Sequence, residues 1–529
     1  MRRHRSPRTS VQGSANVGQG IRRGLAWSTV SSIVLRLGTF SLGIFLARVF
    51  TPEQFGLYAV VLTVQAVLMT LADFGLSTDL IRSADHRRKA PTVATFALVI
   101  SAVLTLAMMS VSQPLADVLG ASDAGPVLAV MSLTLLIAGA GVVPYATLQC
   151  TFRQKQVFLV AVVDFVVGTA VIVVLVMDGW GVMALAVSRV AAQLAAVIVQ
   201  FVLVGERPRF GWDGTIARGA VAFGVPVAGA NLLSWALLGA DKILVSGLAG
   251  ATALGFYFLA FNVANWPMSV LGQVVRSVSL PAFSRVAGGD RDRSLAITLA
   301  PVWGVAAVAG LMLIVLAAPA IELLYGARWL AAAPLLMMLG GFGALRTVLD
   351  LATSYLLARG ESGRVFWLQV AWMALLIPAL VVSILGWGIH GAALAQLIVS
   401  VVLLGLYARA LGRVGVDLRA GWSSFWPPLA ASVPAGAAVW LVTSFSELSE
   451  RAGFADVAGF AGAPLIELLL GGLVGTAVYA GLLWRWMVAR IATARQLGSE
   501  DLIEPPIEPR HEGTSSTSAS SSRALEGTP

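Results

Sequence analysis

Apolar runs of about 20 residues, the length that an α-helix needs to cross the core of a bilayer, follow one another along most of the chain. Short polar connections separate them. Membrane β-strands would instead alternate apolar and polar residues over short segments. The pattern predicts fourteen membrane-spanning helices, at residues 24–49, 55–77, 91–112, 125–148, 157–177, 180–204, 217–247, 252–275, 295–318, 331–357, 365–386, 389–408, 423–445 and 464–484.

Composition supports this prediction. Hydrophobic residues make up 57% of the 529 residues and charged residues 12%, and the mean hydropathy is +0.84, far from the averages of soluble domains. The single Cys150 cannot form an internal disulfide, and the four histidines are scattered. We therefore expect an all-α polytopic membrane protein with no metal site and no cofactor.

The distribution of lysine and arginine predicts the orientation. If the N-terminus is cytoplasmic, the inner connections and segments hold 27 of these residues, and the outer connections hold only Arg328 and Arg451. Cytoplasmic loops carry such an excess, so both termini are predicted to be cytoplasmic. The net charge of +9 reports this bias, and no nucleic-acid partner is expected. The outer connections are also too short for the catalytic loop of a membrane-embedded glycosyltransferase, so we expect no enzyme.

An internal repeat predicts how the spans are arranged. The segment "FGLYAVVLTVQAV" (55–67) parallels "LGFYFLAFNVANW" (254–266), and residues 150–189 parallel residues 356–397. Six spans, an even number, separate the copies, so both copies have the same orientation. Parallel repeats predict two pseudo-symmetric six-helix lobes, as in alternating-access transporters. The predicted parts are a basic cytoplasmic segment (1–23), an N-lobe (24–204), a C-lobe (205–412), spans 13 and 14 (413–490) and a disordered cytoplasmic tail (491–529).

Four stretches carry a resemblance to a known family: "LARVFTPEQFGLYAV", "ADFGLSTDLIR", "ADKILVSGLAGATALGFYFLAFNVANWP" and "SLPAFSRV". They resemble the polysaccharide transporter family of lipid-linked oligosaccharide flippases, in the multidrug/oligosaccharidyl-lipid/polysaccharide exporter superfamily. The resemblance implies a flippase of the bacterial plasma (inner) membrane that moves an undecaprenyl-pyrophosphate-linked oligosaccharide outward for cell-surface polysaccharide biosynthesis. It implies the lipid-linked substrate, membrane lipids, a polymerase and glycosyltransferases as partners.

Three arginines are predicted near the middle of the bilayer: Arg36, Arg189 and Arg346. A charge at that depth costs at least about 2.5 kcal/mol, so each needs a partner, a wet cavity or a ligand. Asp164 lies at nearly the depth of Arg189, and Asp350 follows Arg346 by four residues, so structural ion pairs are the alternative to a binding role. Arg36 has no such carboxylate nearby. Because guanidinium groups match phosphate oxygens, we expect the three arginines to hold the pyrophosphate, with Arg36 leading.

The adjacent Asp241 and Lys242 are predicted about five residues, or 7–8 Å, from the outer end of the seventh span. Lys242 could extend from there to the headgroups. We interpret this pair as an outer gate or a lobe-packing pair. Asp73 and Asp79, near the inner end of the second span, are interpreted first as inner-gate or interfacial residues and second as proton-coupling sites.

Amide side chains within the spans are candidates for binding the hydroxyl groups of a glycan. Each is also a candidate for an ordinary hydrogen bond between helices. They include Gln193, Gln396 and Asn231.

Two other transporter classes remain as alternatives. A cation-coupled multidrug or small-molecule antiporter of the same superfamily would need an acidic cavity, which an unpaired Arg36 disfavours. A major-facilitator transporter also has two six-helix lobes. However, residues 79–91 do not reproduce the Gly-x-x-x-Asp-Arg-type motif of that class.

Overall fold

The computed structural model describes residues 35–83, 85–151, 153–205, 209–285, 291–451 and 463–500, and all regular structure in these ranges is helical. Residues 35–49 form the first helix. The others are α2 (Pro52–Asp73), α3 (Leu76–Arg82), α4 (His86–Val118), η1 (Ser122–Ala124), α5 (Gly125–Cys150), α6 (Gln154–Met177), α7 (Met183–Val204), α8 (Gly214–Ala249), α9 (Ala251–Arg285), α10 (Arg291–Val315), α11 (Ala317–Tyr325), η2 (Ala327–Ala332), α12 (Ala333–Ala358), α13 (Ser362–Arg413), α14 (Leu418–Arg451) and α16 (Ala463–Glu500).

The all-helical membrane class is confirmed. In the described ranges, 11 helices are long and apolar enough to cross a membrane. One of them, α13, contains both predicted spans 365–386 and 389–408, which meet at Gly388 with φ of 59°, a backbone value that favours glycine. The count of fourteen stays a prediction. The predicted segment 1–23 and the tail beyond residue 500 lie outside the described residues, and α16 continues to Glu500, into the range predicted as tail.

The ends of α2 follow directly from its sequence. Thr51 caps the start: its hydroxyl accepts a hydrogen bond from the Gln54 backbone N–H, and the Gln54 side chain accepts one from the Thr51 N–H. This reciprocal arrangement, followed by proline at the first helical position, is a strong helix start. At the other end Phe74 and Gly75 both have positive φ, 47° and 69°, and turn the chain into α3.

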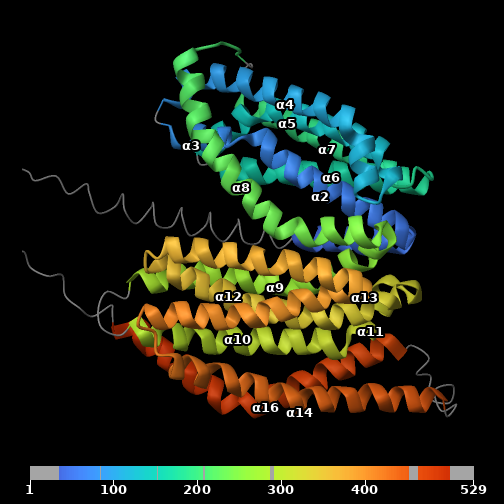
Figure 1. The fold of residues 1–529 in the computed structure, drawn as a ribbon, viewed down its shortest axis with the longest axis vertical. Coiled ribbons are helices and arrows are strands. Elements are labelled where there is room, and N and C mark those ends of the chain that lie inside the picture. Colours follow the sequence, from blue (N-terminus) through green and yellow to red (C-terminus); the bar gives the residue numbers. More distant parts are fainter. Residues whose placement is uncertain are drawn as a thin grey trace, which may run out of the picture.

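The helices pack into two bundles (Figure 1). In the N-bundle (α2–α7), α5 lies against α4 and α7, and α7 lies against α6. In the C-bundle (α9–α16), α12 lies against α9, α10 and α13, while α14 and α16 cover the side of α10 that is remote from the N-bundle. Helix α8 contacts α2, α3 and α4 as well as α9 and α13, so it runs along the boundary between the bundles.

The two ends of the molecule along the helix axes are called here the α11 end and the α3 end (Figure 1). The α11 end, predicted to face outward, contains the starts of α2 and α9 together with α11 and η2. The largest buried apolar cluster crosses the boundary between the bundles, because it contains Leu46 and Val60 together with Leu259 and Leu339. Whether the two bundles superpose as a parallel repeat stays a prediction.

Candidate functional site: the boundary between the bundles

Two glycines bring the bundles into backbone contact at the α11 end. Gly56 in α2 and Gly255 in α9 occupy matching positions of the sequence repeat. A β-carbon added at Gly56 would overlap the carbonyl oxygen of Ala251, and one added at Gly255 would overlap the carbonyl oxygen of Pro52. The first turns of α2 and α9 therefore meet at a distance that only glycine permits. Phe55 packs beside this contact, with its ring 5.9 Å from that of Phe258.

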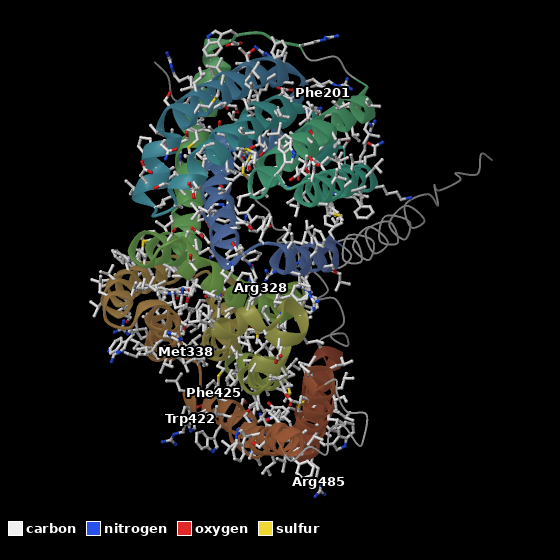
Figure 2. All side chains as sticks on the ribbon, turned by 90° about the vertical axis from the view of Figure 1, so that its right-hand side faces the viewer. Phe201, Arg328, Met338, Trp422, Phe425 and Arg485 are labelled. Atoms are coloured by element: carbon white, nitrogen blue, oxygen red, sulfur yellow. The ribbon has the colours of Figure 1, made fainter. Side chains whose placement is uncertain are left out.

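Two arginines reinforce the same contact by capping helix ends across the boundary. Arg48, at the end of the first helix, donates to the carbonyl oxygens of Leu324 (2.8 Å) and Leu323 (2.5 Å) in the last turn of α11. In return, Arg328 in η2 donates to the carbonyl oxygens of Ala47 (2.9 Å) and Arg48. Figure 2 shows Arg328 between the first helix and the C-bundle. Cations are favourable at helix C-termini, where the last carbonyls lack helical partners, so each bundle caps a helix of the other.

The indole of Trp329 completes this group of cross-boundary bonds, which we call the arginine clamp (Arg48, Arg328 and Trp329). Its Nε1–H donates to the Ala47 carbonyl oxygen at 2.8 Å. The side chain is fully buried and its ring stands edge-on to Phe55 at 5.3 Å. Arg328 is thus one of the two outer basic residues that depart from the predicted charge bias, and it has a structural role.

Arg36 also reaches across the boundary. Its Nη1 donates to the Ser269 hydroxyl in α9 at 2.7 Å, and the nearby rings of Phe40 and Trp266 stack at 5.1 Å. Arg36 forms no ion pair within the described part of the chain. The guanidinium therefore faces the other bundle and is bonded to a neutral hydroxyl.

The other two predicted arginines lie inside separate bundles. Arg189 (α7) forms an ion pair with Asp164 (α6) at 3.6 Å, as the alternative prediction had it, although its Nε is buried without a partner. Arg346 (α12) lies 5.9 Å from the ring centre of Phe342 and 5.7 Å from that of Trp372. In the part of the chain that the structure describes, no ion pair joins Arg346 to Asp350, so the alternative offered by their i,i+4 spacing is not found.

Asp241 and Lys242 belong to a buried polar network. The Asp241 carboxylate, only 2% exposed, accepts hydrogen bonds from the Tyr257 hydroxyl (2.8 Å) and the Gln396 amide (3.3 Å). It also forms an ion pair with Lys242 at 3.3 Å. The Lys242 ammonium lies 4.1 Å from the ring centre of Phe261, so it points into the protein. The network ties α8 to α9 and α13.

The remaining predicted residues are dispersed. Asp79 in α3 pairs with Lys89 in α4 at 3.2 Å, which fixes the turn at the α3 end. Asn231 is exposed on α8, and Gln396 is 4% exposed within the Asp241 network. Asp73 and Gln193 alone among the predicted residues line a described cavity. The searched residues contain no group of three or more His, Cys, Asp or Glu side chains that could hold a metal ion.

That cavity, the N-bundle cavity, has a volume of about 360 Å³ and lies between α2, α3, α5 and α7. Its polar lining consists of Asp73, Ser77, Tyr145, Gln193 and Gln200. Sequence reasoning missed Ser77, Tyr145 and Gln200. Gln193 and Gln200 are seven residues apart in an apolar helix, so they share one face, and this spacing was the signal that could have revealed the cavity.

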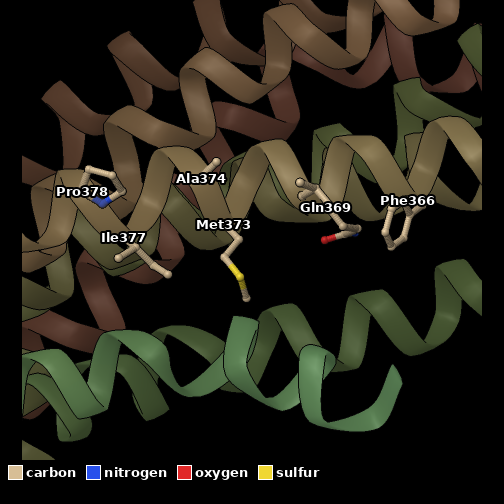
Figure 3. Close-up of a pocket in the computed structure, with 7 residues that line it drawn as sticks. Phe366, Gln369, Met373, Ala374, Ile377 and Pro378 are labelled. Atoms are coloured by element: carbon tan, nitrogen blue, oxygen red, sulfur yellow. The ribbon is translucent and has the colours of Figure 1, made fainter. Parts of the chain in front are cut away.

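A second cavity, of about 470 Å³, has the opposite chemistry. It is lined from α13 by Phe366, Gln369, Val370, Met373, Ala374, Ile377 and Pro378. Figure 3 shows Met373 and Ile377 pointing from α13 towards a green ribbon that belongs to α8. Apart from Gln369 the lining is apolar, so this space suits hydrocarbon.

Comparison with known sequences gives three main findings. A sequence profile for the family described as "Polysaccharide biosynthesis protein" matches residues 45–334. The "Succinoglycan biosynthesis transport protein ExoT" of Rhizobium meliloti (strain 1021) is 27% identical over 356 residues, which cover 66% of this chain and 71% of ExoT. The "Lipopolysaccharide biosynthesis protein WzxC" of Escherichia coli (strain K12) is 26% identical over 431 residues, which cover 78% of this chain and 85% of WzxC.

Solved structures with a similar fold include a "Lipid II flippase MurJ, inward closed conformation", with a TM-score of 0.67 and 14% identity, covering 90% of this chain and 99% of MurJ. An inward-facing multidrug transporter of the MATE family has a TM-score of 0.57 and 17% identity, covering 72% of this chain and 95% of the transporter. At these identities the likeness concerns the fold, which is that of two-bundle membrane transporters.

Proposed function

Since the chain belongs to the polysaccharide biosynthesis protein family, we propose that it is a flippase that moves an undecaprenyl-pyrophosphate-linked oligosaccharide across the bacterial plasma membrane. The resemblance found in the sequence is confirmed by this family and by relatives named for polysaccharide transport and biosynthesis. The glycan serves cell-surface polysaccharide biosynthesis, and its suppliers and users are glycosyltransferases and a polymerase.

The proposed mechanism is alternating access between two states. The predicted charge bias makes the α3 end cytoplasmic and the α11 end external, with both termini inside. The glycine contact and the arginine clamp then close the external side in the present state. Substrate enters from the cytoplasmic side, and opening of the α11 end releases it outward.

Arg36 is the residue that we assign to the pyrophosphate. The observation that carries this assignment is its guanidinium at the bundle boundary, bonded to the neutral Ser269 hydroxyl at 2.7 Å and to no carboxylate in the described part of the chain. A guanidinium presents several donors in one plane and suits phosphate oxygens. Arg189 and Arg346 contribute second, because Asp164 already neutralises Arg189 and two aromatic rings hold Arg346.

The test is export of surface polysaccharide by a strain that lacks its own copy and carries variants of this chain. Arg36→Gln should lower export at least about tenfold, the effect of losing about 1.4 kcal/mol of interaction. Arg36→Lys keeps the charge but loses the planar donors, so it should retain part of the activity. Membrane abundance is measured in parallel, and Ser269→Ala serves as the control that removes only the neutral partner. Wild-type export by abundant Arg36→Gln protein would overturn the assignment.

The alternative function, a cation-coupled antiporter, is less well supported. Such a carrier needs an unpaired acid facing the substrate path. The boundary instead presents Arg36, and Asp164, Asp241 and Asp79 are each paired with a cation. Asp73, which lines a cavity inside the N-bundle, is the acid that such a carrier could use.

A further inference from the structure

The polar groups of the N-bundle cavity are short of protein partners. Gln200 is only 7% exposed, yet its Oε1 has no hydrogen-bond partner. No ion pair or hydrogen bond to the Asp73 carboxylate is found in the part of the chain that the structure describes. The Tyr145 hydroxyl accepts from the Gln149 amide at 2.8 Å, which leaves its own proton free to donate. A buried polar atom without a partner is costly, so this group of side chains is suited to a bound polar molecule.

The charges around the cavity exclude an anionic ligand. Its lining contains one carboxylate, Asp73, and no lysine, arginine or histidine. A pyrophosphate would be repelled by Asp73 and would find no cation to balance its charge. The ligand of this cavity is therefore a different part of the substrate from the part that Arg36 is proposed to hold.

The size of the cavity gives room for a ligand larger than a single ion. Its volume of about 360 Å³ is on the order of ten times the share of one water molecule in the liquid, about 30 Å³. It falls within the range of small-molecule sites, about 300–1,000 Å³. Gly141 helps to keep this space open, because a β-carbon there would come within 3.1 Å of Gln200 Oε1 and 2.8 Å of Val197.

The lining alternates hydrogen-bonding groups with apolar surfaces. Met69, Ala72 and Val142 lie among the polar side chains. A sugar ring has the same character, with hydroxyl groups around its edge and C–H bonds on its faces. Carboxylate and amide oxygens accept from the hydroxyls, and the amide nitrogens and the Tyr145 hydroxyl donate to them.

We propose that the N-bundle cavity is a sugar subsite that takes one neutral, hydroxyl-rich ring of the glycan. The proposal rests on the proposed function and deepens it, because it separates the recognition of the sugar from that of the pyrophosphate. Asp73 and Ser77 place the subsite towards the α3 end, where the substrate enters. Specificity for the glycan therefore resides in the N-bundle.

The experiment uses the purified full-length protein in lipid nanodiscs. Saturation-transfer-difference NMR measures binding of glucose, galactose and N-acetylglucosamine as neutral probes, with inorganic pyrophosphate as a charged probe. Gln200→Leu and Asp73→Asn should weaken binding of the preferred sugar at least about tenfold, equivalent to 1.4 kcal/mol, while pyrophosphate binding is unchanged. The matched control is Gln156→Leu, because Gln156 in α6 also has a buried, unpartnered Oε1 but does not line the cavity.

Each other outcome overturns the subsite. Absence of sugar binding to the wild type would do so, as would equal binding by Gln200→Leu and the Gln156→Leu control. If sodium- or proton-dependent signals vanish in Asp73→Asn while sugar binding persists, the ligand of the cavity is a cation and not a sugar. Export in cells separates this proposal from the flippase function: failure of the wild type to restore export refutes the function. If the wild type restores export, and abundant Gln200→Leu and Asp73→Asn proteins restore it equally well, the subsite alone is refuted.

Discussion

The two ends of the bundle boundary are held together in different ways. At the α11 end, backbone touches backbone at Gly56 and Gly255, and the arginine clamp bonds to main-chain carbonyls. At the α3 end, the N-bundle contacts α8 instead, partly through side chains and partly through backbone, because a β-carbon added at Gly224 would overlap the Phe74 carbonyl oxygen. The Arg82 guanidinium lies 4.5 Å from the ring centre of Phe223, and Val227 packs on Gly75.

This difference indicates which end of the boundary tolerates small structural changes. Main-chain contacts have one geometry, because the helix backbones cannot adjust to an added atom as side chains can. Side chains such as Arg82 can change rotamer and keep part of their contact. We therefore expect the α11 end, where the two bundles meet directly, to behave as a two-position gate. The α3 end, where side chains of α8 add to one backbone contact, should adapt more gradually.

The largest expected effect comes from adding one atom to the glycine contact. Gly56→Ala places a β-carbon on the Ala251 carbonyl oxygen and should cost the closed state about 1–3 kcal/mol. Export should fall about tenfold or more, with normal abundance in the membrane. Gly43→Ala in the first helix is the control, because a β-carbon there meets nothing within 4 Å. Equal export by the two variants would show that the bundles do not need this approach.

A smaller effect is expected from the arginine clamp. Arg48→Ala and Arg328→Ala each remove hydrogen bonds to carbonyl groups and should cost the closed state about 1 kcal/mol, roughly a fivefold change in the open-to-closed ratio. Spin labels at Asp178, in the turn after α6, and at Trp387, beside the Gly388 bend of α13, both exposed, would report the separation at this end by double electron–electron resonance, with Cys150→Ser as the background.

The double variant then tests whether the clamp acts as one unit. If the two caps depend on each other, the combined cost differs from the sum of the single costs. A distance distribution identical to that of the parent in all three variants would mean that the clamp does not hold this end closed.

The smallest effect is expected at the α3 end. Arg82→Ala removes a partly exposed cation–aromatic contact that contributes about 0.5–1 kcal/mol. Export should stay within about fivefold of the wild type, and Arg82→Lys should be nearer still. A loss as large as that of Gly56→Ala would erase the contrast between the two ends.

Sequence patterns predicted those features of the fold that depend on a few neighbouring residues. The apolar runs and the matched Gly56 and Gly255 are written in a few neighbouring residues, and each predicted span overlaps a helix of the structure. The Arg189–Asp164 pair was foreseen as an alternative from similar depth in consecutive spans.

Contacts between residues that are far apart in the sequence could not be predicted, because no local pattern marks them. Arg328 bonds to Ala47 across 281 positions, and the sequence showed only that it was an exception to the charge bias. A pair between Arg346 and Asp350 was the alternative to a binding role, but spacing alone does not reveal that the Arg346 guanidinium lies near Trp372 from another helix. Of the polar residues that line the N-bundle cavity, Asp73 and Gln193 were candidates in the sequence analysis, but Gln200 and Tyr145 were not.

The chemistry of the arginine clamp bears on how transport is energised. Guanidinium groups remain protonated at any physiological pH, and the carbonyl oxygens that they contact have no proton to gain or lose. Breaking and re-forming the clamp therefore neither binds nor releases a proton. Because the acceptors are neutral, added salt also weakens the clamp less than it would weaken an ion pair. If a proton gradient drives the cycle, the coupling must occur at a titratable group outside the clamp.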